Sequence, residues 1–238
     1  LSSLEASDWD MSEVTKANEM FSYCGITSLD ADNWVMNNLT NAEYMFQYCE
    51  KLTELKVSNW GMKSVTSTRR MFYHTDALPI LNASNWTMEK LTKAVDMFYY
   101  NSGIKTLNAA NWIRGNAMSL DSIFYLCKKV ETIDVSNWDT SNCTTATYLF
   151  CGCDKLKSVD LSSWDLSKVK SFDNVFTACS ALKSVTFNTE INADATFTNM
   201  FTSGTTGTLY YYPHASFVEK FLPCLPSTWT AIDITTLE

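Results

Sequence analysis

Seven tryptophans divide most of the chain into units of nearly constant length, and this spacing limits its possible folds more than any other feature. One step of 25 residues is followed by five steps of 26, through Trp9, Trp34, Trp60, Trp86, Trp112, Trp138 and Trp164. An apolar residue followed by phenylalanine keeps the same phase, from Met20–Phe21 to Met200–Phe201. A fixed period of this length is typical of arrays in which each unit stacks on the next.

Each unit contains two apolar patterns. Before the tryptophan, residues two apart, such as Leu55 and Val57, are placed on one face of a short strand. After it, Ala42, Phe46 and Cys49 step by four and three, which predicts a short helical or 3₁₀ return. Between the two patterns an asparagine precedes five of the tryptophans, and we expect a left-handed turn there. The sequence therefore predicts an α/β repeat solenoid.

The chain is expected to contain the repeats in residues 1–206 and a C-terminal cap in residues 207–238. The first segment holds seven clear repeats and a degenerate eighth, in which Glu190 stands where a tryptophan should be. In the second, residues 209–212 predict a strand, residues 214–222 a helix between two prolines, and residues 232–234 a final strand. An array needs such a different end element to shield its last unit.

The segment "ETIDVSNWDTSNCTTATYLFCGCDKLKSVDLSSWD" closely resembles the BspA-like leucine-rich-repeat surface proteins of bacteria. It is most similar to the branch with lipoprotein-type W-D-T-S-x-V and M-F-x-x-C repeats. The resemblance covers nearly the whole chain, because "TLYYYPHASFVEKF" is similar to the ending common in that family, although "IRGNAMSL" departs from the repeat. It implies a right-handed leucine-rich-repeat-like stack of 25–26-residue coils. It also implies a secreted or lipid-anchored surface protein, some relatives being associated with adhesion, but it carries over no binding residue.

The distribution of charge argues against nucleic acid as a partner. Residues 1–50 carry nine acidic side chains against Lys16 alone, whereas residues 51–238 sum to zero. An acidic end repels a phosphate backbone, and nucleic-acid binders need clustered lysine and arginine. No apolar run is long enough for a transmembrane segment. The chain opens inside a repeat, which suggests a fragment whose processing signals were removed. On the family resemblance we expect an extracellular or outer-surface protein, lipid-anchored through the missing N-terminus.

The sequence carries no recognisable catalytic or cofactor motif, and we expect no enzyme and no cofactor. Its two histidines, His74 and His214, belong to different predicted elements, so a triad or a histidine-rich metal site is hard to assemble. A paired-carboxylate glycosidase stays open on composition. However, Asp30, Asp134 and Asp160 share one strand-face position with Lys and Asn residues in other units, which favours a solvated face.

The cysteines predict a ladder of buried free thiols. Five share the position three after the phenylalanine, namely Cys24, Cys49, Cys127, Cys153 and Cys179. Neighbours in register on stacked coils have poor geometry for a disulfide. Cys143 occupies an apolar column and acts as a small hydrophobe. The alternative, a metal bound by Cys151 and Cys153, lacks a second cysteine pair.

The best binding candidates are the aromatic residues that directly follow the phenylalanine column. Two adjacent positions cannot both point inward beside Phe and Cys, so at least one column should lie near the surface. We expect a tyrosine strip across units one to five, and the candidate ligand-binding residues are Tyr23, Tyr48, Tyr73, His74, Tyr99, Tyr100 and Tyr125. The alternative is that these rings cover the joints between coils. The second candidate surface is the strand face, with Ser3, Ser28, Glu54, Ile80, Thr106, Thr132, Ser158 and Ser184.

Together these patterns and the family resemblance lead us to expect a non-enzymatic cell-surface interaction or adhesion module. Its expected partner is a protein or glycan on a host or neighbouring cell. Two alternatives remain: a structural spacer array that carries another domain, and a carbohydrate-active enzyme.

Overall fold

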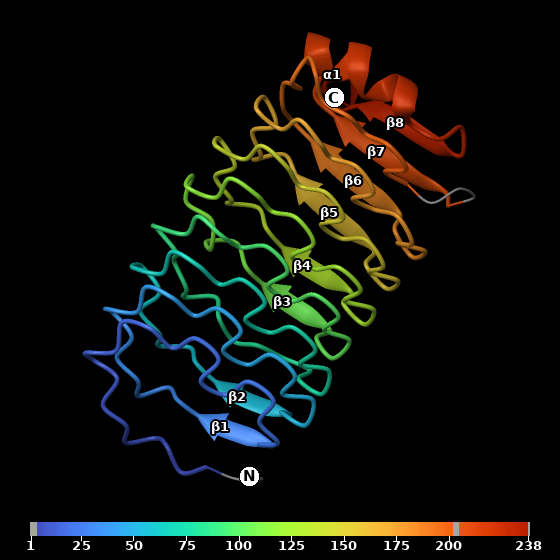
Figure 1. The fold of residues 1–238 in the computed structure, drawn as a ribbon. Coiled ribbons are helices and arrows are strands. Elements are labelled where there is room, and N and C mark those ends of the chain that lie inside the picture. Colours follow the sequence, from blue (N-terminus) through green and yellow to red (C-terminus); the bar gives the residue numbers. More distant parts are fainter. Residues whose placement is uncertain (1–3, 202–204, 238) are drawn as a thin grey trace.

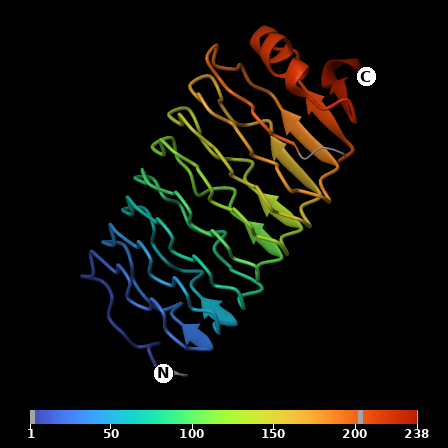
Figure 2. The ribbon, with the colours of Figure 1, turned by 45° about the vertical axis from the view of Figure 1, so that its right-hand side comes forward.

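The computed structural model describes residues 4–201 and 205–237, and Ser3 of the strand-face candidates lies outside them. The chain winds into an elongated stack of coils, with the N-terminus at one end and α1 with the C-terminus at the other (Figures 1 and 2). A parallel bridge on the return side recurs at eight successive positions, from Lys16 to Thr196. The predicted solenoid is confirmed as a parallel β-solenoid of about eight coils. We number the coils so that coil one contains Trp9 and coil eight Glu190.

Short parallel strands lie above one another along one side of the stack (Figure 2). In the repeats they are β1 (Ser28–Asp30), β2 (Glu54–Lys56), β3 (Thr106–Asn108), β4 (Thr132–Asp134), β5 (Ser158–Leu161) and β6 (Ser184–Phe187). Partners lie one period apart, as in Ser28 opposite Glu54. Each three-residue strand buries only its central residue, which gives the alternation expected from the sequence.

The strand ladder is interrupted in coil four, and Pro79 supplies the reason. In the neighbouring coils the residue at this position donates its backbone N–H to the coil before, as Thr53 does to Thr27 at 2.8 Å and Lys105 does to Pro79 at 3.1 Å. Proline has no N–H, so the bond from residue 79 to residue 53 cannot form. On the strand side coil four accordingly contributes only an isolated bridge, between Ile80 and Thr106.

The predicted helical or 3₁₀ return is wrong: residues 4–201 contain no helix, and the return is a run of turns. In each of coils one to seven two residues around the phenylalanine have positive φ, for example 58° at Glu19 and 57° at Tyr23 in coil one. Phe21 donates its N–H to Met45 of the next coil at 2.9 Å, whereas Ser22 donates to Glu19 within its own turn. An α-helix would need negative φ throughout and every N–H bonded within the coil.

The left-handed turn expected at the asparagine before each tryptophan is also wrong. None of Asn33, Asn59, Asn85, Asn111 and Asn137 has positive φ. The left-handed residues belong to the return instead, and most of them are neither glycine nor asparagine. Their conformation is stabilised by hydrogen bonds to the next coil, which the residue type alone does not reveal.

The tryptophans form a buried column, as the spacing predicts. Trp34, Trp86, Trp112, Trp138 and Trp164 are at most 2% exposed. The rings of consecutive coils lie 5.6–5.8 Å apart from Trp9 to Trp112, and Trp138 lies 5.5 Å from Trp164. From Trp34 onward, each indole Nε1–H donates to a carbonyl of the preceding coil, as Trp86 does to Val57 at 2.9 Å. The column therefore joins apolar burial to a satisfied polar group in coils two to seven.

The C-terminal segment contains β7 (Gly207–Tyr211), α1 (Ala215–Lys220) and β8 (Trp229–Asp233), with 3₁₀ turns at Leu222–Cys224 and Ile234–Thr236. β7 and β8 continue the parallel sheet of β5 and β6 (Figure 1). Phe217 and Phe221 are buried against Phe187 of β6, with ring centroids 5.4 and 5.2 Å away. None of the helices in the described part of the chain has the length and apolar character needed to cross a bilayer.

Candidate functional site

Eight aromatic residues on the return side form a continuous surface that we call the aromatic strip. It runs over coils one to six and consists of Tyr23, Tyr48, Tyr73, His74, Tyr99, Tyr100, Tyr125 and Tyr148. The first seven are the residues that the sequence singles out. All eight are partly or fully exposed, from the half-buried Tyr73 to Tyr23, which is 70% exposed.

The outer column of the strip is a parallel ring stack. Tyr23 and Tyr48 lie 4.6 Å apart between centroids, Tyr48 and His74 5.1 Å, and His74 and Tyr100 4.9 Å. The planes of these pairs differ by only 8–16°. Each ring therefore covers a face of the next, and the outward-facing part is mainly ring edge and polar tip.

The inner column begins one residue earlier and sits deeper. Tyr73, Tyr99 and Tyr125 stack at 5.4 and 4.6 Å, and all three are half-buried. Edge-on contacts join the two columns, as between Tyr48 and Tyr73 at 5.1 Å. Tyr148 extends the strip by an edge contact with Tyr125 at 5.9 Å. The rings are thus restrained by one another before any partner arrives.

The backbone explains why the outer column points outward. Tyr23, Tyr48, His74 and Tyr100 all have φ between 54° and 60°. Tyr48 donates its N–H to Tyr73 of the next coil at 2.8 Å, and Tyr100 donates to Tyr125 at the same distance. These bonds hold the left-handed conformation, while the flanking Phe and Cys side chains remain in the core.

The environment keeps the inner phenols protonated. Burial, followed by a hydrogen bond with Tyr48, raises the pKa of Tyr73 to about 12. Burial also raises the pKa of Tyr99 and of Tyr125. Since tyrosine normally titrates near pH 10, these hydroxyls stay neutral hydrogen-bond donors throughout the physiological range.

Shallow hollows flank the strip at both ends. One of about 400 Å³ is lined by Tyr23, Tyr48, Glu50 and Lys51, together with Cys24 and Gly25. Another, of about 300 Å³, lies among Tyr99, Ser122, Tyr125 and Tyr148. Both are open to solvent and can receive side chains of a partner.

One cation is fixed beside the strip. The Arg70 guanidinium lies over the Tyr73 ring at 5.3 Å and donates to Asp96 at 3.0 Å. Asp96 is buried, so this pair anchors the arginine rather than leaving it free for a ligand.

A family model described as "Mycoplasma protein of unknown function, DUF285" matches the chain twice, over residues 2–112 and 100–208. The matches together include all the tryptophan coils and the whole aromatic strip. The chain belongs to the DUF285 family. Comparisons with curated proteins and with solved structures return no match.

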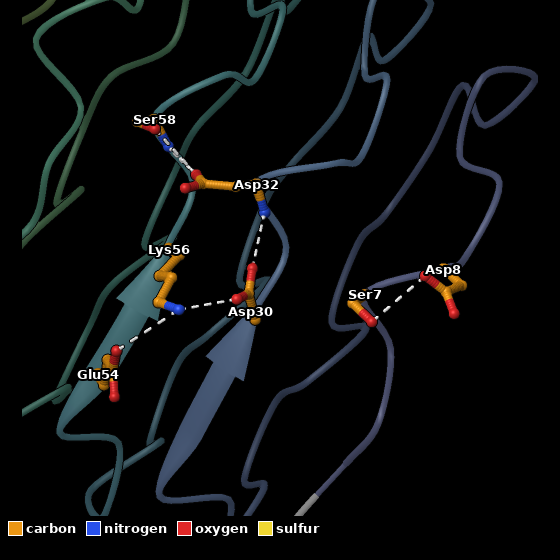
Figure 3. Close-up of polar contacts among 7 residues, drawn as sticks. All are labelled: Ser7, Asp8, Asp30, Asp32, Glu54, Lys56 and Ser58. Carbon is orange, nitrogen blue, oxygen red and sulfur yellow. Dashed lines mark hydrogen bonds and ion pairs between the residues drawn. The ribbon is translucent and has the colours of Figure 1, made fainter.

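The strand-face carboxylates of this DUF285 chain are engaged in structural contacts. Figure 3 shows Asp30 accepting from Lys56 at 2.8 Å and from the backbone of Asp32, which in turn accepts from Ser58 of the next coil. The bond from Lys56 lowers the pKa of Asp30. The other two acids of this column likewise accept the backbone N–H two residues on, Asp134 from Ser136 and Asp160 from Ser162. These bonds fix the corner after each strand.

The two histidines of this DUF285 chain lie in separate polar contacts. His74 Nδ1 is 3.1 Å from Asp76 and its ring belongs to the strip. His214, at the start of α1, contacts Glu190 at 3.4 Å and Asn188 at 2.8 Å. Ser216 donates to Glu190, not to a histidine, so the cluster lacks the nucleophile–base contact of a hydrolase triad. The described residues contain no group of three or more His, Cys, Asp or Glu placed to hold a metal.

The thiol ladder of this DUF285 chain matches the sequence prediction in four of its five positions, since all eight cysteines are free and only Cys24 of the ladder is half-buried rather than buried. Four ladder thiols donate to the phenylalanine carbonyl of the coil before, Cys49 to Phe21 at 3.0 Å and the others likewise in Cys127, Cys153 and Cys179. Thr75 makes the same contact with Phe46. The position therefore selects a small inward-facing donor rather than a metal ligand.

We expect alkylating reagents to modify the exposed Cys224 first, and the four fully buried ladder thiols, unlike the half-buried Cys24, only after unfolding. Burial raises the pKa of Cys49 and of Cys179 to about 12, so at pH 8 the reactive thiolate is scarcer there than in an ordinary cysteine. Mass spectrometry after timed iodoacetamide labelling, with and without urea, measures this order. A Cys224→Ser variant is the control. Labelling of Cys49 or Cys179 in the folded protein as fast as Cys224 would contradict the burial of the ladder.

Proposed function

We propose that this chain is a non-enzymatic interaction or adhesion module of a bacterial cell surface, which binds a protein or glycan of another cell through the aromatic strip. The observation that carries the proposal is the strip itself: eight mutually contacting rings, all at least partly exposed, on one side of six successive coils. The exposed aromatic residues on this side of the stack thus form one continuous surface that a partner could contact.

The energetics of such a surface favour binding. Tyrosine supplies a large contact area with few rotatable bonds and a polar tip. Here neighbouring rings already restrict each side chain, so little further conformational entropy is lost when a partner docks. A core-stabilised stack of coils also holds the rings at fixed spacing, which a flexible loop would not.

The resemblance of the repeats to BspA-like proteins supports the cellular setting. We also propose that the chain is related to that leucine-rich-repeat branch and that its coils wind in a right-handed sense. We propose further that the protein lies outside the cell and carries a lipid anchor. The joint-covering role of the rings is compatible with binding, because the inner column can seal the coils while the outer column meets a partner.

Removing two outer rings should abolish most binding. We expect Tyr48→Asn/Tyr100→Asn to weaken binding to a panel of host matrix proteins and glycans at least 30-fold, because central aromatic anchors commonly contribute more than about 1 kcal/mol each. Asparagine is chosen since it adopts positive φ more readily than alanine does. Surface plasmon resonance on the panel provides the measurement, and Tyr212→Asn, which removes an exposed tyrosine outside the strip, is the matched control.

The outcomes separate the alternatives. Equal binding by wild type and the double variant would eliminate the strip as the binding surface. If wild type binds nothing on the panel, the spacer array becomes the better account. A carbohydrate-active enzyme would instead cleave the glycans and release products. Substitution of Asp30, Asp134 or Asp160 would then prevent this release.

A further inference from the structure

We infer that the outer column of the strip takes a polyproline II segment of a partner protein, laid along the axis of the stack across Tyr48, His74 and Tyr100. This inference rests on the proposed function and names the kind of partner. It follows from which parts of the rings are accessible, what they donate and how they are spaced.

Most of the ring faces in the outer column are not accessible to a ligand. In the outer column the centroids are 4.6–5.1 Å apart and the planes nearly parallel, so Tyr48 and His74 are covered on both sides by their neighbours. A cation binds over the face of an aromatic ring, and a sugar that stacks on a ring needs the same face. Along most of the column neither mode has room, which disfavours a glycan and a lysine- or arginine-led partner.

The accessible parts are positively polarised ring edges and hydroxyl donors. The edge of an aromatic ring carries the positive end of its quadrupole, and a protonated phenol donates a hydrogen bond. The natural complement is a row of uncommitted acceptors beside apolar groups. A polyproline II helix provides both, because its carbonyls have no internal hydrogen bonds and its proline rings are apolar.

The spacing of the rings agrees with the repeat of that helix. Tyr48 to His74 is 5.1 Å and His74 to Tyr100 is 4.9 Å. Alternate rings therefore lie roughly 10 Å apart, close to the about 9.3 Å in which polyproline II completes a turn of three residues. An extended β-strand covers a similar length in three residues, but its residues i and i+3 face opposite sides. Of these two conformations, only polyproline II therefore presents the same face of the peptide to every second ring.

The hollows suggest how such a segment ends. They lie beside Tyr23 and Tyr48 at one end and beside Tyr125 and Tyr148 at the other. Side chains larger than proline at the two ends of a proline core would enter them. A segment of about ten residues, roughly 31 Å long at 3.1 Å per residue, is long enough to cover the whole strip.

The test uses fluorescein-labelled decaproline, with a Gly-Ser decapeptide as the flexible control. By fluorescence anisotropy we expect decaproline to bind wild type at least tenfold more tightly than the Gly-Ser peptide. Binding should fall at least tenfold in Tyr48→Asn/Tyr100→Asn and remain unchanged in Tyr212→Asn. Circular dichroism melting of each variant shows whether it is folded.

A second variant keeps the inference testable if the double asparagine variant does not fold. Tyr48→Phe/Tyr100→Phe keeps both rings and removes only the hydroxyl donors, and we expect decaproline binding to weaken at least threefold. Equal affinity for the two peptides would overturn the inference. If, at the same time, panel binding still depended on the rings, the proposed function would stand without it. If neither ligand depended on the rings, both proposals would fail.

Discussion

Trp86→Ala is expected to lower the free energy of unfolding by about 3–5 kcal/mol, the range for removing a large buried aromatic side chain. The indole is fully buried between Trp60 and Trp112, at 5.8 and 5.6 Å. Its loss opens a cavity in the column and removes the hydrogen bond to the Val57 carbonyl. Urea denaturation followed by circular dichroism measures the change.

Trp9→Ala is the matched control for this experiment. Trp9 is 39% exposed and stacks on Trp34 at 5.7 Å, so its removal leaves a more open and partly solvated gap. We expect a loss of about 1–2 kcal/mol, smaller than the Trp86 value. A loss below about 1 kcal/mol for Trp86, or equal losses for both, would show that the column does not stabilise the stack as described.

Gly103→Ala is expected to destabilise the protein by about 3 kcal/mol, at the upper end of the usual cost of overpacking. A Cβ at this position would lie 2.6 Å from the carbonyl oxygens of Asp76 and Leu78 and 2.9 Å from the Leu78 nitrogen. All three are backbone atoms, so relief requires displacing the chain that joins coils three and four. The same urea titration measures the effect.

Gly61→Ala provides the comparison. A Cβ there would also clash, but with the side-chain oxygen of Asn37, which can rotate away. We therefore expect a change of less than about 0.5 kcal/mol, as for most surface substitutions. If both alanine variants had the same stability, the close backbone approach at Gly103 would not be a constraint on the fold.

The period of the sequence was sufficient to predict the solenoid, because no other arrangement places seven tryptophans in register. It was insufficient for the return. The steps of four and three in Ala42, Phe46 and Cys49 suit a helix, but they suit equally a run of turns in which alternate N–H groups bond to the next coil. That choice depends on carbonyls about 24 residues away, and tyrosine or glutamate at the left-handed positions gives no local signal.

The candidate strip could be predicted in part for a geometric reason. Two neighbouring residues beside a buried Phe and Cys cannot both face the core, so Tyr99 and Tyr100 had to include a surface residue. The face-to-face stacking and the hollows could not be predicted, because they depend on ring rotation and on the distance between coils. Tyr148 was missed because its column holds Glu19, Arg70, Asp96 and Ser122 in other coils, and only Tyr44 repeats its aromatic character.

The buried thiols could be predicted because the prediction depended only on the position of each cysteine within the repeat. Residues stacked in phase face the same interior, and a free thiol suits an apolar column. The sequence did not reveal that the thiols also donate to the phenylalanine carbonyls, a role that Thr75 shares. That observation accounts for the cysteines and for Thr75 at this position, where valine would lack a donor, but not for Asn101 in coil four.

The indoles, the ladder thiols and alternate N–H groups of the return donate hydrogen bonds that connect different coils. Each of these bonds is accepted by the adjoining coil and by no coil further away. Deleting or duplicating one whole period therefore leaves each donor opposite an equivalent acceptor, and the joint that results is the same as the joint that was lost. Unequal recombination within the gene can accordingly lengthen or shorten such a protein in steps of about 26 codons, changing how far the aromatic strip extends without the need to evolve a new core.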